Sequence, residues 1–250
     1  AEIAFRDGAY DKKGETKTKG EDERFLVDGA AIVERAKKNP AKVGEVFERT
    51  LHFQRVVTYH GDKRVSQLIH QAREIVVEPR TPNELYERNV PYEGDQVELV
   101  YARVHRKDGT IAQPDEQSSV GAYIKWPQLK QGDVVEFVVR SWTSQPVGRR
   151  GDPPFYFIDY VGSTSTRPVL FNEVIVESPE NSQLGVDVIN GTAEKSEDKI
   201  ENGKRVLRYT WENPPIVPDE PLSPSQTELT PLVIGSTFRS WDHFRTWYQT

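Results

Sequence analysis

Apolar and polar residues alternate in short runs along most of the chain. Residues 46–59 show a period of two, in which Leu51, Phe53, Val57 and Tyr59 alternate with His52, Gln54 and Thr58. This alternation is typical of a β-strand that buries one face. Gly61-Asp62 then supplies a turn, and residues 64–78 return as a partner strand. The pattern predicts an antiparallel β-hairpin.

Strand-like segments of this kind recur as far as residue 212. They lie at residues 96–106, 121–126, 134–142, 155–161, 169–177, 184–189 and 204–212. The turn dipeptides Asp108-Gly109, Asn190-Gly191 and Asn202-Gly203 separate several of them. The Pro-rich segment 214–231 cannot join a central strand and should lie on the surface. Many short strands and few helices predict an all-β fold, a large antiparallel β-sandwich over residues 45–232.

The N-terminal residues follow a helical period instead. Between residues 21 and 39, Phe25, Ile32, Val33 and Ala36 fall on one face, and Asn39-Pro40 ends the pattern. We therefore expect residues 1–44 to form a helical and loop extension. Its first ten residues look like the tail of an upstream helical region.

The C-terminal residues also predict a helix, and an unusually aromatic one. Ser240 is a suitable N-cap, and Trp241, Phe244, Trp247 and Tyr248 recur on one face behind it. So short a helix is marginal alone in water and needs a partner to pack against. We expect residues 233–250 to be a linker and helix, with these four aromatic residues at a domain interface and the helix partly docked on the sandwich.

Composition narrows the class of protein. The chain has 250 residues and a net charge of −6, with Lys and Arg interleaved among Asp and Glu. Because no basic stripe emerges, we expect no nucleic-acid partner. The sequence contains no Cys, which excludes a disulfide or a Cys nucleophile within these residues, and no apolar run approaches the ~18 residues of a membrane span. It also contains no Met, which fits a chain cut from a longer precursor.

Several ordered phrases carry a family resemblance. They are "VELVYARVHRKDGTIAQP", "YIKWPQLKQGDVVEFVVRSW", "FYFIDYV" followed by "RPVLFNEVIVESP", and "LRYTWENPPIVPDEP" leading to "PLVIGSTFRSWDHFRTWYQ". Together they cover roughly residues 45–250 and resemble the uncharacterised β-rich domain immediately N-terminal to the transglutaminase-like (papain-fold) core of bacterial envelope proteins.

This resemblance implies a function and a place in the cell. In that family the "STFxSW" phrase leads through a short helix into the transglutaminase-like domain with its Cys, His and Asp. Any such catalytic set would lie beyond Thr250, so we expect a non-catalytic accessory domain that positions or binds protein or peptide substrate. The resemblance implies the periplasm or cell envelope of a bacterium, and the adjoining domain as a partner.

Signals for chemistry within the chain are weak. His52, His70 and His105 alternate inside predicted strands, and we interpret them as half-exposed sheet residues. The "HGD" turn at His60 has no second ligand pair, so we expect no metal and no cofactor. "VGSTST" lacks the second glycine of a Ser-hydrolase nucleophile elbow. The loop carboxylates Asp115-Glu116 and Asp219-Glu220 leave a glycosidase-like enzyme as a distant third hypothesis.

An aromatic and charged cluster at residues 141–160 is the candidate binding site. Its members are Trp142, Arg149, Arg150, Asp152 and Tyr156. Trp and Tyr faces beside polar groups bind sugars or peptides, so the alternative function is a free-standing carbohydrate- or peptide-binding module. Core packing around a salt-bridged loop is the competing explanation.

Overall fold

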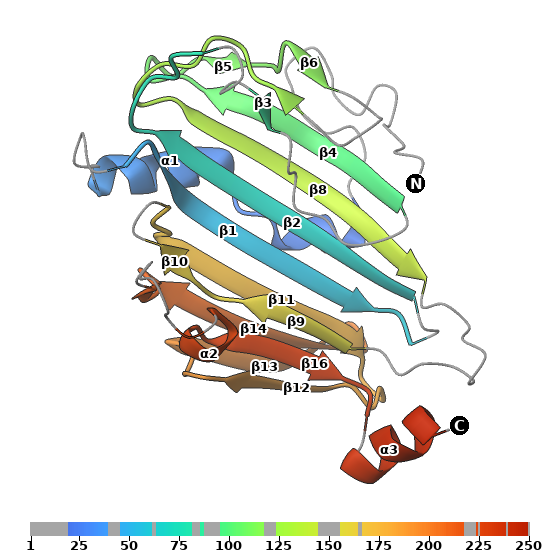
Figure 1. The fold of residues 1–250 in the computed structure, drawn as a ribbon. Coiled ribbons are helices and arrows are strands. Elements are labelled where there is room, and N and C mark those ends of the chain that lie inside the picture. Colours follow the sequence, from blue (N-terminus) through green and yellow to red (C-terminus); the bar gives the residue numbers. More distant parts are fainter. Residues whose placement is uncertain are drawn as a thin grey trace.

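A computed structural model describes residues 20–39, 46–61, 64–81, 86–87, 96–117, 124–144, 156–164, 167–217, 224, 226–238 and 240–249. Its main element is an eight-stranded sheet (Figure 1). In spatial order the strands are β13 (Lys195–Glu201), β14 (Lys204–Glu212), β11 (Phe171–Pro179), β1 (Glu48–Tyr59), β2 (Arg64–Ile75), β8 (Val134–Ser144), β4 (Gln96–His105) and β5 (Ile111–Ala112).

Smaller elements cover this sheet. One three-stranded sheet has the order β12 (Gly185–Ile189), β16 (Leu232–Ser236), β9 (Tyr156–Tyr160), and another has the order β3 (Tyr86–Glu87), β7 (Ile124–Lys125), β6 (Glu116–Gln117). A short pair joins β10 (Ser163–Thr164) to β15 (Ile216–Val217). The helices are η1 (Glu21–Phe25), α1 (Gly29–Lys38), α2 (Gln226–Leu229) and α3 (Trp241–Gln249).

The predicted all-β, sandwich-like fold class is confirmed. The β1–β2 hairpin forms in antiparallel register, and the Asp108-Gly109 turn joins β4 to β5. Asn202 and Gly203 both have positive φ, 53° and 74°, as a two-residue hairpin turn between β13 and β14 requires. Two pairings of the described strands differ from the antiparallel expectation. The short β10–β15 pair is parallel. Strands β1 and β11 run parallel, because a long excursion separates them in the sequence.

One face of the large sheet is apolar and forms the sandwich core. A cluster that includes Val97, Phe137 and Val139 is closed by Ile124 and Trp126 around β7. A second cluster that includes Val57 and Val174 is closed by Phe157 and Val233 of the β12–β16–β9 sheet, which lies in front of the large sheet in Figure 1. Burial of these side chains is the main source of fold stability.

The opposite face carries the N-terminal segment, residues 20–39, which lies behind the sheet in Figure 1. The helix predicted over residues 21–39 forms as two pieces, η1 and α1, separated at residues 26–28. The break follows from Asp28, whose side chain accepts a hydrogen bond from the Ala30 amide and caps α1. Phe25, Ile32 and Ala36 are buried, as the helical pattern predicted.

The C-terminal elements differ from the expected boundary. Residues 233–236, expected to begin a linker, belong to β16, which pairs on both sides with β12 and β9. The predicted N-cap is confirmed, since Ser240 Oγ accepts a hydrogen bond from the His243 amide. Helix α3 stands beyond the end of β16, apart from both sheets (Figure 1). The expected partial docking of this helix on the sandwich stays a prediction, because the aromatic side chains that would make the contact lie outside the described residues.

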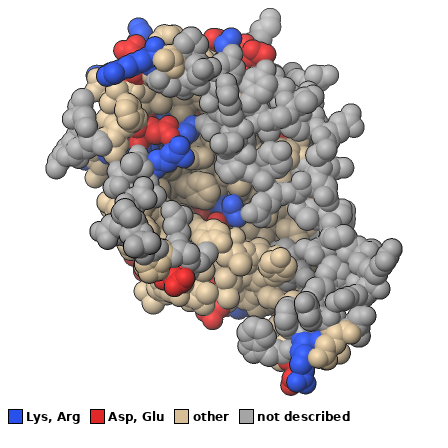
Figure 2. All heavy atoms as spheres, viewed as in Figure 1, with Lys and Arg blue, Asp and Glu red and all other residues tan. Residues whose placement is uncertain are grey.

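Within the described part of the chain, no helix is long and apolar enough to cross a membrane. The face in Figure 2 shows Lys and Arg close to Asp and Glu, with no extended patch of one sign among the coloured residues. This mixture agrees with the interleaved charges of the sequence.

Candidate functional site

The face of the large sheet under the N-terminal segment is unusually polar. Its inward side chains include buried polar or charged residues on four adjacent strands: His52, Gln54 and Thr58 on β1, Ser66 and His70 on β2, Glu136 and Arg140 on β8, and Glu98 on β4. Burying such groups is costly unless each is hydrogen-bonded or paired. This polar face and the segment that covers it form the candidate functional site.

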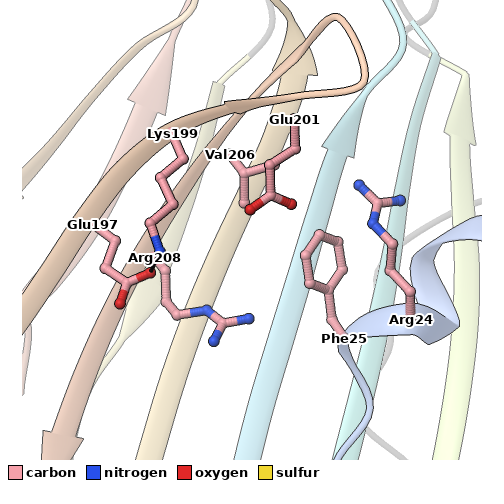
Figure 3. Close-up of a pocket in the computed structure, with 7 residues that line it drawn as sticks. All are labelled: Arg24, Phe25, Glu197, Lys199, Glu201, Val206 and Arg208. Atoms are coloured by element: carbon pink, nitrogen blue, oxygen red, sulfur yellow. Dashed lines mark hydrogen bonds and ion pairs between the residues drawn. The ribbon is translucent and has the colours of Figure 1, made fainter.

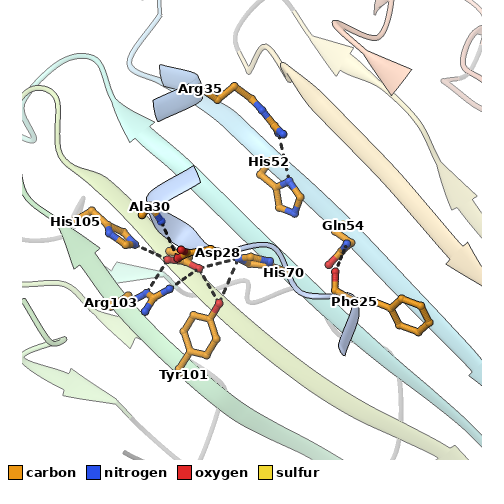
Figure 4. A network of polar contacts seen from close by, with 11 residues as sticks. Phe25, Asp28, Ala30, Arg35, His52, Gln54, His70, Tyr101, Arg103 and His105 are labelled. Carbon is orange, nitrogen blue, oxygen red and sulfur yellow. Dashed lines mark hydrogen bonds and ion pairs between the residues drawn. The ribbon is translucent and has the colours of Figure 1, made fainter. Parts of the chain in front are cut away.

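Glu136 is the centre of the polar face. Its Oε1 accepts hydrogen bonds from Tyr101 (2.7 Å) and Arg103 Nη2 (3.2 Å), and lies 2.8 Å from His70 Nε2. Its Oε2 accepts from Arg103 Nε at 2.7 Å and lies 2.5 Å from His105 Nε2. Figure 4 shows these side chains converging on one carboxylate. Burial opposes ionisation, but the bonds from His105, His70 and Arg103 outweigh it and hold the pKa of Glu136 well below its usual value.

Helix α1 begins directly over this carboxylate. A Cβ atom added to Gly29 would lie 2.3 Å from Glu136 Oε2 and 2.7 Å from Arg103 Nη2. Only glycine allows so close an approach of backbone to the buried carboxylate. The positive end of the helix dipole also stabilises a negative charge at this position. Glu136 therefore joins strands β2, β4 and β8, and its carboxylate lies against the start of α1.

His52 lies beside this centre. It is fully buried, its ring stacks 5.2 Å from that of Phe171, and Arg35 Nη1 lies 3.5 Å from its Nδ1. Burial, then the charges of His70 and Arg35, lower the pKa of His52 well below its usual value. The sequence interpretation of His52 and His70 as half-exposed is wrong, because the N-terminal segment covers both. His105 is partly exposed, as expected.

A second charged centre fixes η1. Arg140 donates to Asp22 at 2.7 and 2.9 Å, to Glu23 at 2.5 Å and to Glu98 at 2.9 Å. Burial alone would lower the pKa of Arg140, but the bonds to Asp22 and Glu23 raise it above its usual value. Arg24 forms an ion pair with Glu177 on β11. Charged contacts therefore hold the η1 end of the segment to β8 and β11.

Three cavities border the N-terminal segment. The first, of about 250 Å³, lies between Phe25 and the charged side chains of β13 and β14, among them Glu197, Lys199 and Arg208 (Figure 3). A second, of about 210 Å³, lies near Trp142 and Arg140. The third and largest of these, about 340 Å³, lies beside α1 at the ends of β2 and β4.

One pair in the second cavity could serve nucleophilic chemistry. Ser66 Oγ lies 3.0 Å from His60 Nε2, the separation of a Ser–His dyad. Within the described residues, however, no carboxylate is hydrogen-bonded to His60, and the charged neighbours Glu21 and Glu177 are bonded to Lys204. Acidic neighbours also disfavour an oxyanion. The described residues contain no group of three or more His, Cys, Asp or Glu side chains that could hold a metal ion.

The predicted binding cluster is not brought together. Trp142 lies on the polar face, with Arg140 Cζ 6.0 Å from its ring centroid. Tyr156 lies on β9, on the far side of the sandwich core, and is 65% exposed. Arg149, Arg150 and Asp152 lie outside the described residues, as do the side chains of Trp241, Phe244, Trp247 and Tyr248.

Tyr156 instead belongs to an exposed apolar surface. On β9 the buried Phe157 and Asp159 alternate with Tyr156, Ile158 and Tyr160, which are 65%, 41% and 49% exposed. Register places Ile158 beside Ile234 of β16, which leads within five residues to α3. The surface over these strands is mainly uncharged in Figure 2. We call Tyr156, Ile158, Tyr160 and Ile234 the β9 surface.

Comparisons with known proteins show the fold alone. No family model matches the chain, and no curated protein matches it. A crystal structure described as a "putative protease" from Parabacteroides distasonis has a TM-score of 0.60 and 15% identity, over 81% of this chain and 42% of that one. An M1 zinc metallopeptidase from Deinococcus radiodurans has a TM-score of 0.41 and 11% identity, over 75% and 42% of the two chains. The chain thus spans less than half the length of these structures.

Proposed function

We propose that this chain is a non-catalytic accessory domain of a transglutaminase-like protein in a bacterial envelope. It packs against the adjoining domain and helps to position a protein or peptide substrate for it. The proposal rests first on the ordered phrases between residues 45 and 250, which resemble the domain that precedes the transglutaminase-like core.

The observation that carries the proposal is the β9 surface. Large apolar side chains exposed together on one sheet face mark interaction sites in soluble proteins. Tyr156 and Tyr160 each combine an apolar ring with a hydroxyl, a combination enriched at protein interfaces. The surface continues along β16 toward α3, the helix that leads into the next domain in the resembling family. Surface and helix together suit the adjoining domain as partner.

The solved structure from Parabacteroides distasonis supports the proposal that this fold is one part of a larger protein, and it carries no argument about the activity of that protein. The present chain covers 42% of that larger chain, so the same fold occurs there as one part of a longer protein.

Hydroxyl-radical footprinting tests the proposal on this chain and on a longer chain that includes the adjoining domain. Tyr156 and Tyr160 should be labelled readily in the shorter chain and protected in the longer one. Tyr156→Ser with Tyr160→Ser should lower the melting temperature of the longer chain alone. Ile200→Ser, at a 53% exposed position on β13, is the matched control and should change neither chain. Equal labelling of both tyrosines in the two chains, or no transglutaminase-like domain in the gene, would refute the proposal.

A carbohydrate- or peptide-binding module is the second candidate, favoured by the spacing of two tyrosines. Tyr156 and Tyr160 lie on the same face four residues apart, about 13 Å along the strand at ~3.3 Å per residue. Two rings so placed form a platform for an extended ligand. A glycan and peptide array tests this binding function. The candidate requires saturable binding of a glycan or peptide, and Tyr160→Ser should abolish that binding.

A further inference from the structure

The largest of the three cavities differs from the other two in its lining. It lies beside α1, where β2 and β4 end and β8 begins. Its apolar wall is formed by Val33 and Ala36 of α1, Ile75 and Val76 at the end of β2, and Val134 of β8. The cavity near Phe25, by contrast, is lined mainly by charged side chains of both signs. At about 340 Å³ the cavity beside α1 falls within the size range of small-molecule sites.

Most charged groups around this cavity are already neutralised inside the protein. Glu74 pairs with Arg49 at 2.5 Å, and Arg106 pairs with the buried Asp133 at 2.5 Å. His105 is bonded to Glu136 at 2.5 Å. The carboxylate that lines the cavity, Glu74, is therefore held by its own partner and does not balance the remaining cations.

Two lysines remain at the cavity mouth. Lys37 meets Glu34 at 2.5 Å, but both side chains are more than half exposed, so the pair contributes little and is readily exchanged. The stem of Lys107 lies over Gly132, since a Cβ added to Gly132 would be 3.4 Å from Lys107 Cδ. Within the described residues Lys107 forms no ion pair. A cavity with an apolar wall and an ammonium group at its rim is complementary to a ligand whose apolar tail ends in an anionic group.

We propose that this cavity binds a small amphipathic carboxylate, with its apolar tail against Val33, Ile75 and Val76 and its carboxylate at Lys107 and Lys37. The chemistry is shared by a medium-chain fatty acid and by the C-terminus of an apolar peptide. The site is separate from the β9 surface, so the proposal does not depend on the accessory function.

Amide resonances of the full chain test the proposal in a titration with octanoate. The amides of Gly109 and Gly132, which line the cavity, should shift and saturate. Those of Gly185 and Gly203, on other strands and turns, should not move. 1-Octanol and octylammonium have the same tail with a neutral or cationic head, and should bind at least tenfold more weakly. Acetyl-Leu-Leu distinguishes the peptide source from the fatty acid by its relative affinity.

Lys107→Glu should weaken octanoate binding at least tenfold. Lys195→Glu is the control and should leave the affinity unchanged. This lysine lies on the edge strand β13, its side chain is 73% exposed, and among the described residues it forms only a solvent-exposed pair with Glu212 at 3.8 Å. The proposal is overturned if octanoate, octanol and octylammonium bind equally, or if Lys107→Glu binds like the parent. It is equally overturned if Gly109 and Gly132 show no saturable shift at a dissociation constant tighter than about 1 mM.

Discussion

The two faces of the large sheet are stabilised by different physics. Glu136 and Phe137 are consecutive on β8 and point to opposite faces, and both are fully buried. Phe137 packs among aliphatic side chains of the sandwich core. Glu136 sits among Tyr101, Arg103 and His70 under the N-terminal segment. At these two positions, apolar packing holds the sandwich layer, whereas directed bonds at Glu136 add to the apolar packing of Phe25 and Ile32 that also holds the N-terminal segment.

This difference determines how well each face of the sheet tolerates substitutions. Apolar packing is non-directional and tolerates substitutions that keep volume. A buried charged network tolerates little, because removing one partner leaves the others buried and unpaired. The polar face therefore fixes the N-terminal segment in one position and register. The same dependence should make the stability of that segment depend on pH, whereas the aliphatic packing of the sandwich core carries no charge to titrate.

The largest losses of stability are expected from one substitution on each face of the sheet, at the adjacent positions 136 and 137. Glu136→Gln should lower the free energy of unfolding by about 3–5 kcal/mol, because it strands Arg103 and the two histidines. Phe137→Ala should cost a similar amount, about 3–5 kcal/mol, through a cavity. Urea denaturation measures both. Hydrogen exchange separates them, since Glu136→Gln should expose the amides of α1 selectively and Phe137→Ala should not.

The stability deficits of Glu136→Gln and Phe137→Ala should depend differently on pH. The pKa of Glu136 is depressed in the folded state, so its contribution is present above the unfolded value of about 4.5 and is lost as pH falls through the folded value. The deficit of Glu136→Gln should therefore shrink below about pH 4.5. The deficit of Phe137→Ala should stay constant, and a parallel decline of both would contradict the comparison.

A backbone substitution tests the polar face with less disruption. Gly29→Ala places a Cβ 2.3 Å from Glu136 Oε2, so α1 or the carboxylate must shift. We expect a loss of about 1–3 kcal/mol in urea, the range for strain and disturbed buried hydrogen bonds. Gly185→Ala, whose added Cβ would meet Ser236 O at an ordinary 3.7 Å, is the control. Equal midpoints for the two variants would show that the close approach at Gly29 is unimportant.

The sequence predicted the apolar face well because local pattern determines it. Alternation in residues 53–59 is visible without tertiary information, and the Asn-Gly turns require particular backbone angles. Leu51 departs from this alternation, because an irregularity between Thr50 and His52 precedes the regular part of β1 and Leu51 packs with Ile32 of α1. The parallel β1–β11 pair could not be predicted in this way. It joins strands far apart in the sequence, and no local signal records which edge a returning strand selects.

The polar face was missed although a signal for it exists. Glu136 and Arg140 interrupt the apolar strand "VVEFVVRSW" at positions of the same parity. Charges on one face of a strand are ordinarily solvated, so the pattern alone does not indicate that this face is covered. Only the covering of that face by residues 20–39 turns His52 and His70 into buried residues. Gly29 is a poor helix former by propensity, yet it is the residue that allows α1 to approach the carboxylate of Glu136.

A smaller effect concerns one histidine of the polar face. The folded-state pKa of His52 lies well below 6.5, so between these values the unfolded chain binds a proton that the folded chain does not. Stability should therefore fall as pH falls below about 6.5, by up to about 1.4 kcal/mol per pH unit. His52→Gln should remove this slope while the slopes from other groups remain. Identical slopes for the parent and the variant between pH 7 and pH 5 would show that His52 titrates alike in both states.

The smallest expected effect tests whether net charge or burial of the charged contacts explains how the polar face stabilises the N-terminal segment. Glu197 on β13 points toward the same side of the sheet as Glu136 and pairs with Lys199 at 2.7 Å, but both side chains are about half exposed. The bond from Lys199 lowers the pKa of Glu197, yet water screens and replaces an exposed pair. Glu197→Gln should therefore leave the urea midpoint and the exchange of α1 unchanged. A large loss at Glu197 would mean that net charge across the face, rather than the desolvated contacts at Glu136, holds the N-terminal segment in place.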